Sequence, residues 1–265
     1  MRWPLPIAAA LALAVAACEE KPKPTANAGQ PPAAAASRPN AADLYRDAWS
    51  RISRELNLAT GMFSFQDGVI RVEASENGPA TWEEIADLLR RNQPVVNDLV
   101  AAAAADRCDW GFPPASSISR RADMGPMLEV HGKRRMMARV LRADAIRAWR
   151  DGDEPGAVAR MSALYGLVCH SPGEPTVTWA LVDVALLTLA NETARGMADA
   201  PPHLSASHRK ALLDQLNRLD PSDPAGLAKA RKAEGPGDAR LEQSLNEAHA
   251  RLAADIAATK AALGE

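Results

Sequence analysis

Two short segments of this 265-residue chain each place a cysteine next to a residue that could bind a metal ion or assist catalysis. Cys169 is followed directly by His170, and Cys108 is followed by Asp109. Thiolate and imidazole groups are zinc ligands, and a cysteine activated by a histidine is a common nucleophile. The spacing argues against both, because adjacent helical residues point about 100° apart and neither C-x-x-C nor H-x-x-x-H occurs. No neighbouring residue marks either thiol for a lowered pKa. We therefore predict no metal and no cofactor.

Acid–base chemistry has weak candidates in this sequence. Two carboxylate clusters, Glu83–Glu84 and residues 151–154, lie where helices are predicted to begin, and acids there favour the helix dipole. A catalytic pair would also need a partner in a cleft, so helix capping explains these acids better. The five histidines form no ligand pattern, and His170 is expected at a helix end as a cation. No catalytic residue is predicted.

The N-terminus carries the most specific motif. Arg2 precedes an apolar run over residues 5–17, which ends in the tetrapeptide VAAC at 15–18. A charged start, a short apolar segment and small residues before a cysteine resemble the signal of bacterial lipoproteins. The resemblance implies that residues 1–17 are removed and that Cys18 carries the lipid, which holds the protein on a membrane without embedding it. An ordinary signal peptide cleaved nearby is the alternative.

Residues 18–39 form the next segment, and they are rich in proline, alanine and small polar side chains. Such a composition cannot bury a core, so we predict a disordered tether. The formal net charge of −2, which becomes −3 without Arg2, argues against nucleic-acid binding. The apolar stretch Val177–Ala190 contains Asp183 and is too short to span a membrane, so it is predicted to be a buried helix.

Two cysteines remain once Cys18 carries a lipid. Cys108 and Cys169 are then an even pair in an oxidising compartment, which favours a disulfide. A bond closing so long a loop would stabilise the fold by about 3–5 kcal/mol. Two independent buried thiols are the alternative, because the sequence contains no information on the distance between them.

Residues 40–265 show the periodicity of amphipathic helices. Asn40 is expected to cap a first helix that runs to Leu56, and Thr81 with Glu84 predicts a capping box. Residues 62–75 are expected to form a long loop or one short extended piece. Further helices are predicted from Pro94 to Ala103 and over residues 126–150, 155–169, 176–198, 204–219 and 239–263, with a broken region over 221–237.

The predicted helix 126–150 carries apolar side chains on one face and arginines on the other. The arginine stripe either binds an anionic membrane surface or an acidic partner, or is a solvated face; it comprises Arg135, Arg139, Arg142 and Arg150. Trp110, two residues before Phe112, is either an exposed recognition tip or a plug for the end of the core. The stripe and Trp110 are the candidate interaction surface.

The CDWG segment at 108–111 is followed by a proline-bearing loop, a long arginine-rich helix and a hairpin broken at Gly152. This arrangement resembles a group of uncharacterised exported bacterial helical proteins over residues 40–220, and the hairpin distantly resembles tetratricopeptide helix pairs. The resemblance carries no catalytic residues across. The repeat of about 34 residues typical of tetratricopeptides is not evident. We therefore predict an all-α fold, an irregular array of antiparallel helical hairpins in a solenoid or bundle.

Together these features predict a lipid-anchored protein of the cell envelope, on its periplasmic or outer face. We expect non-enzymatic binding of an envelope protein or a role in assembly. The alternatives are a hydrolase or small-molecule-binding protein whose site forms only in three dimensions, and a structural component without a ligand. An apolar or charged groove between hairpins would indicate an interaction module, whereas a pocket with converging ionisable groups would indicate an enzyme.

Overall fold

A computed structural model of the chain describes residues 39–73, 78–79, 81–113, 117, 124–172, 175–234 and 239–264. The predicted signal peptide, Cys18 and the tether up to residue 38 lie outside these ranges. The described residues are mostly helical with one small two-stranded sheet, which confirms the prediction of an all-α helical array. No helix among them is both long enough and apolar enough to cross a membrane.

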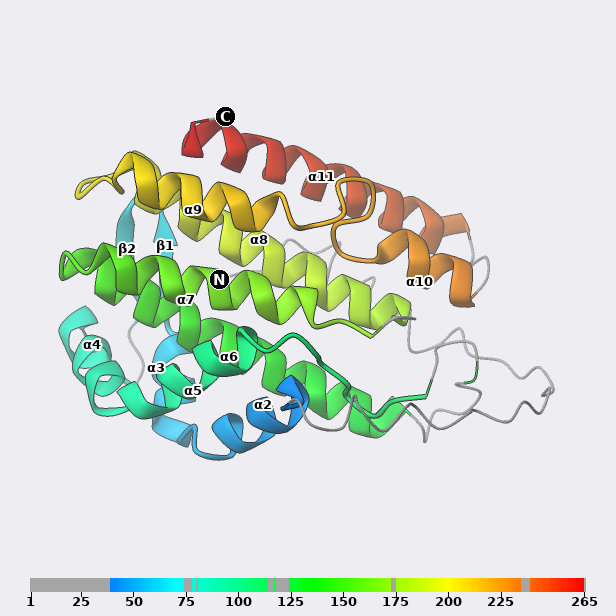
Figure 1. The fold of residues 1–265 in the computed structure, drawn as a ribbon, viewed down its shortest axis with the longest axis horizontal. Coiled ribbons are helices and arrows are strands. Elements are labelled where there is room, and N and C mark those ends of the chain that lie inside the picture. The colour runs from blue at the N-terminus through cyan, green and yellow to red at the C-terminus, as the bar shows by residue number, and fades with distance from the viewer. Residues whose placement is uncertain are drawn as a thin grey trace.

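The long helices lie side by side across the molecule, with shorter helices on either side (Figure 1). The helix α6 packs against α7 and α8, the helix α11 covers α8, and α2 to α5 form the opposite side. The helices are α2 (Ala41–Ser50), α3 (Arg54–Gly61), α4 (Trp82–Arg91), α5 (Gln93–Ala103), α6 (Met124–Arg150), α7 (Glu154–Cys169), α8 (Val177–Asp199), α9 (Ala206–Leu216), α10 (Leu227–Glu234) and α11 (Ala239–Leu263).

Side-chain caps explain where several helices begin. The Asn40 side chain accepts a hydrogen bond from the Ala42 amide, as predicted. The Thr81 hydroxyl accepts from the Glu84 amide while the Glu84 carboxylate accepts from the Thr81 amide, which confirms the capping box. The predicted helix from Asn40 to Leu56 is wrong, because α2 ends at Ser50 and the Ser53 hydroxyl caps a separate helix, α3.

Residues 62–75 contain a β-hairpin instead of the predicted loop or single extended piece. Strand β1 (Phe63–Gln66) pairs antiparallel with β2 (Val69–Val72), and Gln66 faces Val69 across the turn. Asp67 and Gly68 both have positive φ, at 50° and 75°, as a type I′ turn requires. Phe65 is fully buried and its ring lies 5.7 Å from that of Trp149, so the hairpin is fixed to the core.

The predicted two-faced character of the long helix is also wrong. From Met136 to Trp149 most side chains of α6 are buried, including Arg142, Asp144 and Arg147. The cause is its central position, because α6 contacts α3, α4, α5, α7 and α8. The predicted burial of residues 177–190 holds, since α8 is buried over most of its length. The region 221–237, predicted to be broken, contains the additional helix α10.

Candidate functional site

A cleft of about 670 Å³ opens between α3 and α4, beside the short segment Gly78–Pro79. We call it the α3–α4 groove. Helix α3 lines it with Glu55 and Leu58, which lie one turn apart. Helix α4 lines it with Glu84, Asp87, Leu88 and Arg91, which recur at helical spacing on one face, and with Arg90 beside that face.

The groove combines an apolar part with charges of both signs. Leu88 is buried, and Leu58 is one of the few large apolar side chains on the described surface, at 39% exposure. Glu55 and Arg91 are both exposed and make no hydrogen bond or ion pair with any described residue. Charges held beside an apolar surface and left unpaired are available to a partner of complementary charge.

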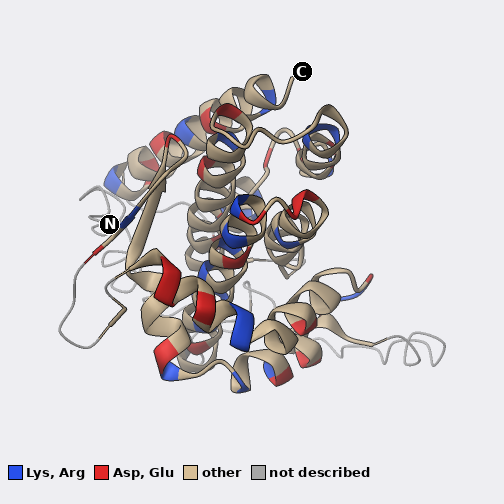
Figure 2. Cartoon of the chain, turned by 90° about the vertical axis from the view of Figure 1, so that its left-hand side faces the viewer, with Lys and Arg blue, Asp and Glu red and all other residues tan. Residues whose placement is uncertain are grey.

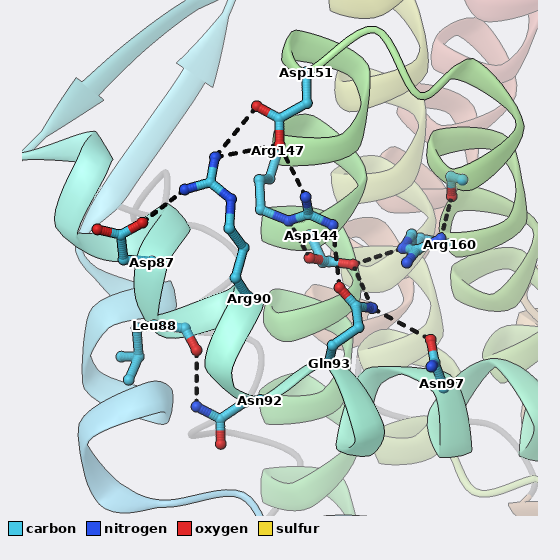
Figure 3. A network of polar contacts seen from close by, with 11 residues as sticks. Asp87, Leu88, Arg90, Asn92, Gln93, Asn97, Asp144, Arg147, Asp151 and Arg160 are labelled. Carbon is cyan, nitrogen blue, oxygen red and sulfur yellow. Dashed lines mark hydrogen bonds and ion pairs between the residues drawn. The ribbon is translucent and has the colours of Figure 1, made fainter.

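Arg90 joins the groove to the interior of the molecule. Its guanidinium bonds Asp87 at 2.6 Å on the groove side and Asp151, after the end of α6, at 3.3 Å (Figure 3). The hydrogen bond to Asp151 and then the one to Asp87 raise the pKa of Arg90 above its ordinary value. Asp151 also accepts from Arg147 at 2.9 Å, so the contact continues inward.

Asp144 is the buried centre of this network. Its carboxylate accepts hydrogen bonds of 2.6 Å from the Nε atoms of Arg147 and Arg160, and one of 3.3 Å from Gln93 (Figure 3). Gln93 begins α5 and Arg160 lies on α7, so one carboxylate connects three helices. The α4 wall of the groove is therefore tied through Arg90 to a rigid interior.

The groove offers little for catalysis. Its lining residues in the described part of the chain include no serine, threonine, cysteine or histidine, so no nucleophile stands beside a base. The three carboxylates, Glu55, Glu84 and Asp87, lie at an open surface rather than in an enclosed pocket. No group of three or more histidine, cysteine or acidic side chains is placed to hold a metal ion within the ranges that the structure describes.

The predicted arginine stripe does not form one surface. Arg142 is 3% exposed, because it donates hydrogen bonds to Thr193 at 3.1 Å and to the Phe65 carbonyl at 3.2 Å. Burial lowers its pKa to about 10. Arg135 and Arg139 are half-buried and Arg150 is exposed at the end of α6. Acidic and basic residues are interspersed over the described helices (Figure 2), so these arginines form no separate basic face.

Trp110 is a core plug and not an exposed tip. It is 3% exposed, and its ring stacks on Tyr45 at 5.7 Å and on Trp49 at 6.2 Å. Its indole N–H donates to the His170 carbonyl at 2.7 Å. Trp110 therefore fixes the CDWG segment against α2 and the end of α7.

The expected cationic role of His170 is wrong. Its Nδ1 pairs with the Tyr45 hydroxyl and its Nε2 lies 3.0 Å from the Ala105 carbonyl, so Nε2 donates and Nδ1 accepts from Tyr45. Burial lowers the pKa of His170, which favours the neutral ring. Cys108 and Cys169 are both free thiols in the structure, so the disulfide that the sequence favours is not formed there.

No protein-family model, curated protein or solved structure matches this chain. The argument for function therefore depends on the chain's own geometry. The α4 half of the groove was readable in the sequence, because Glu84, Asp87 and Arg91 follow helical spacing after the capping box. The α3 half is hidden, since the predicted first helix runs on to Leu56 without the break that separates α2 from α3.

Proposed function

We propose that the protein is a lipid-anchored component of the bacterial cell envelope that binds a partner protein through the α3–α4 groove and does no chemistry on it. The observation that carries this proposal is the groove itself, a cleft of about 670 Å³ in which Glu55 and Arg91, unpaired among the described residues, lie beside the exposed Leu58. A charged groove between helices is what an interaction module needs.

The groove also indicates what the partner presents. Glu55 and Arg91 carry opposite charges on different helices, so a segment with one basic and one acidic side chain complements both. An apolar side chain between them would cover Leu58. Because α4 packs on α6 through its buried face, which includes Ile85 and Leu89, such a segment meets a preformed surface and loses less entropy on binding.

The membrane anchor is supported by the N-terminal sequence. Arg2, the apolar run and the VAAC motif ending at Cys18 resemble the lipoprotein signal, and the described residues begin about 20 positions later. A tether of that length, with the flexibility that its composition predicts, would have a root-mean-square span of roughly 25 Å. The groove would then work close to the membrane that holds the lipid.

The second candidate is binding of a small molecule. The groove volume lies inside the range of about 300–1,000 Å³ that is typical of small-ligand sites. The two functions differ in how they respond to charge reversal in the groove. Binding of a protein partner can be restored by the opposite charge reversal in the partner, whereas a metabolite offers no such compensating change.

Crosslinking in intact cells with mass spectrometry tests the proposal. We expect a reproducible partner with the wild-type chain, loss of that partner on Arg91→Glu, and loss again when Cys18→Ser releases the protein from the membrane fraction. Arg150→Glu, an exposed arginine on α6, is the matched control and should keep the partner. Retention of the same partner by Arg91→Glu contradicts the groove, and membrane retention of Cys18→Ser contradicts the anchor.

A further inference from the structure

A second polar site lies far inside the fold, on α6 and α8. His131 and Arg134 are one turn apart on α6, and both pack on Trp179. The His131 ring centroid is 4.7 Å from that of Trp179, and the Arg134 guanidinium lies 4.5 Å from the same ring. His131 is 2% exposed and Arg134 is not exposed at all.

The Arg134 guanidinium is held by only one of its nitrogen atoms. Nη2 donates to the Leu167 carbonyl at 2.8 Å and to Asp183 at 2.6 Å. The other Asp183 oxygen accepts a short hydrogen bond from Ser171, whose oxygen accepts from the Trp179 indole at 3.0 Å. Both Asp183 oxygens thus accept from Nη2 or from Ser171, and neither is bonded to Nε or Nη1 of Arg134.

Four polar atoms beside this pair have no hydrogen-bond partner in the described chain. They are Nε and Nη1 of Arg134 and both ring nitrogens of His131, and only two further buried side-chain atoms in the described residues share this condition. An unmet buried polar group costs about 1–3 kcal/mol, and native proteins satisfy about 90% or more of them. Four of the six unmet atoms thus belong to two side chains that contact the same Trp179 ring.

The unmet atoms define the chemistry of an occupant. The free N–H groups of Arg134 are donors only, and a neutral imidazole adds one donor and one acceptor. Burial, with a smaller effect of Arg134, lowers the pKa of His131 to about 3, so the ring stays neutral. Donors therefore exceed acceptors, and a group with two acceptor oxygens fits best.

Charge balance gives a further condition. Asp183 already neutralises Arg134, so an incoming anion would leave one buried negative charge in excess. Burial raises the pKa of Asp183 to about 6, which makes this carboxylate the group that takes up a proton. The nearby charged residue Arg135 is half-buried on α6 and adds positive potential.

We propose that His131 and Arg134 form an internal binding site for a small monocarboxylate of the size of formate or acetate. The carboxylate oxygens accept from Nε and Nη1 of Arg134 and from the His131 ring, while Trp179 supplies the apolar wall. Asp183 gains the proton that keeps the buried charge balanced. His131 and Arg134 are almost completely buried, so a larger ligand would have to displace the side chains around them.

Titration of the wild-type protein with sodium acetate, followed by ¹⁵N NMR of the histidine rings, tests the proposal directly. We expect the His131 resonances to shift in a saturable manner, with tighter binding below pH 6 than above it. Sodium chloride at the same ionic strength should leave them unchanged. If the His131 resonances stay unchanged in both acetate and formate, water alone hydrogen-bonds these atoms and the proposal is overturned. An equal response to chloride would also overturn it.

Thermal unfolding supplies a second readout. Ligand that binds only the folded state raises Tm with concentration, so acetate should raise Tm of the wild type and of the control His249→Phe. The variant His131→Phe keeps a ring against Trp179 and removes the polar atoms, and its Tm should not respond to acetate beyond the chloride effect. An acetate response in His131→Phe equal to that of the wild type would overturn the assignment of this site.

Discussion

Arg134 donates a hydrogen bond of 2.6 Å to Asp183 at a point where neither side chain is exposed to solvent. Each charge has been removed from water, so each depends on the other for compensation. The pair joins α6 to α8, the two helices that form the centre of the fold. Its loss should therefore affect the whole domain and not one local turn.

Replacement of Asp183 by alanine is expected to lower the free energy of unfolding by about 3–5 kcal/mol, because it leaves Arg134 buried without a carboxylate. Chemical denaturation measures this. Asp214→Ala is the control, since its exposed pair with Lys210 at 3.0 Å should contribute less than about 1 kcal/mol. Equal losses in the two variants would show that Arg134 is compensated by another group.

Stability should also depend on pH through His131. Its folded pKa of about 3 lies below the unfolded value of 6.5, so the folded state binds fewer protons and loses stability as pH falls between these values. The full effect over this interval is roughly 5 kcal/mol. Asp183 acts in the opposite sense, because its raised pKa of about 6 makes its contribution fall as pH rises from 3.8 to 6.

The variant His131→Leu separates these two effects. Without the imidazole the variant lacks the His131 contribution, so it should gain stability relative to the wild type as the pH falls below 6.5. The same pH profile in both proteins would mean that His131 is not the group that resists protonation.

Contact between the β-hairpin and α8 gives a steric prediction. A Cβ atom at Gly196 would lie 2.5 Å from the ring of the buried Phe65, so Gly196→Ala should destabilise the fold by about 1–3 kcal/mol. At Gly132, inside α6, a Cβ would meet nothing within 4 Å. Gly132→Ala should therefore stabilise by roughly 0.5–1 kcal/mol. Thermal unfolding of both variants checks the opposite signs, and matching signs would contradict the packing of Phe65.

The sequence predicted most helices because their apolar side chains recur at helical spacing and their caps are local. Thr81 and Glu84 interact across one turn, so their pairing is visible without the fold. The hairpin had its own local signal, since Asp67-Gly68 separates two β-rich segments by two residues. Each strand has only 4 residues, so the pattern on either side of the turn is short.

The buried charges could not be predicted in the same way. Arg142 lies on a helix face that a sequence pattern places in solvent, yet Thr193 and the Phe65 carbonyl, distant in the chain, satisfy its donors in the interior. The burial of α6 depends on how many helices pack around it, and its own sequence does not contain that number. Pairings between distant segments, and the groove between α3 and α4, exist only once the chain has folded.

The two thiols should differ in reactivity. Burial raises the pKa of both thiols, that of Cys108 to about 12, but Cys108 is half-buried whereas the Cys169 residue is exposed at the end of α7. Thiolate is the reactive form, so alkylation of the folded, unreduced protein should modify Cys169 first and Cys108 slowly. Peptide mass mapping after alkylation, with and without prior reduction, checks this. A peptide pair joined through Cys108 and Cys169 would instead restore the disulfide hypothesis.

The most direct test of the proposed function is photo-crosslinking in cells from two matched positions. Leu58, in the α3–α4 groove, is 39% exposed, and Leu128, near the start of α6 and outside the groove, is 41% exposed. A photoreactive amino acid at each position reports what protein lies against it. We predict one discrete adduct from position 58 that Arg91→Glu abolishes, and no such adduct from position 128. The same adducts from both positions, or none from position 58, would contradict binding of a partner in the groove.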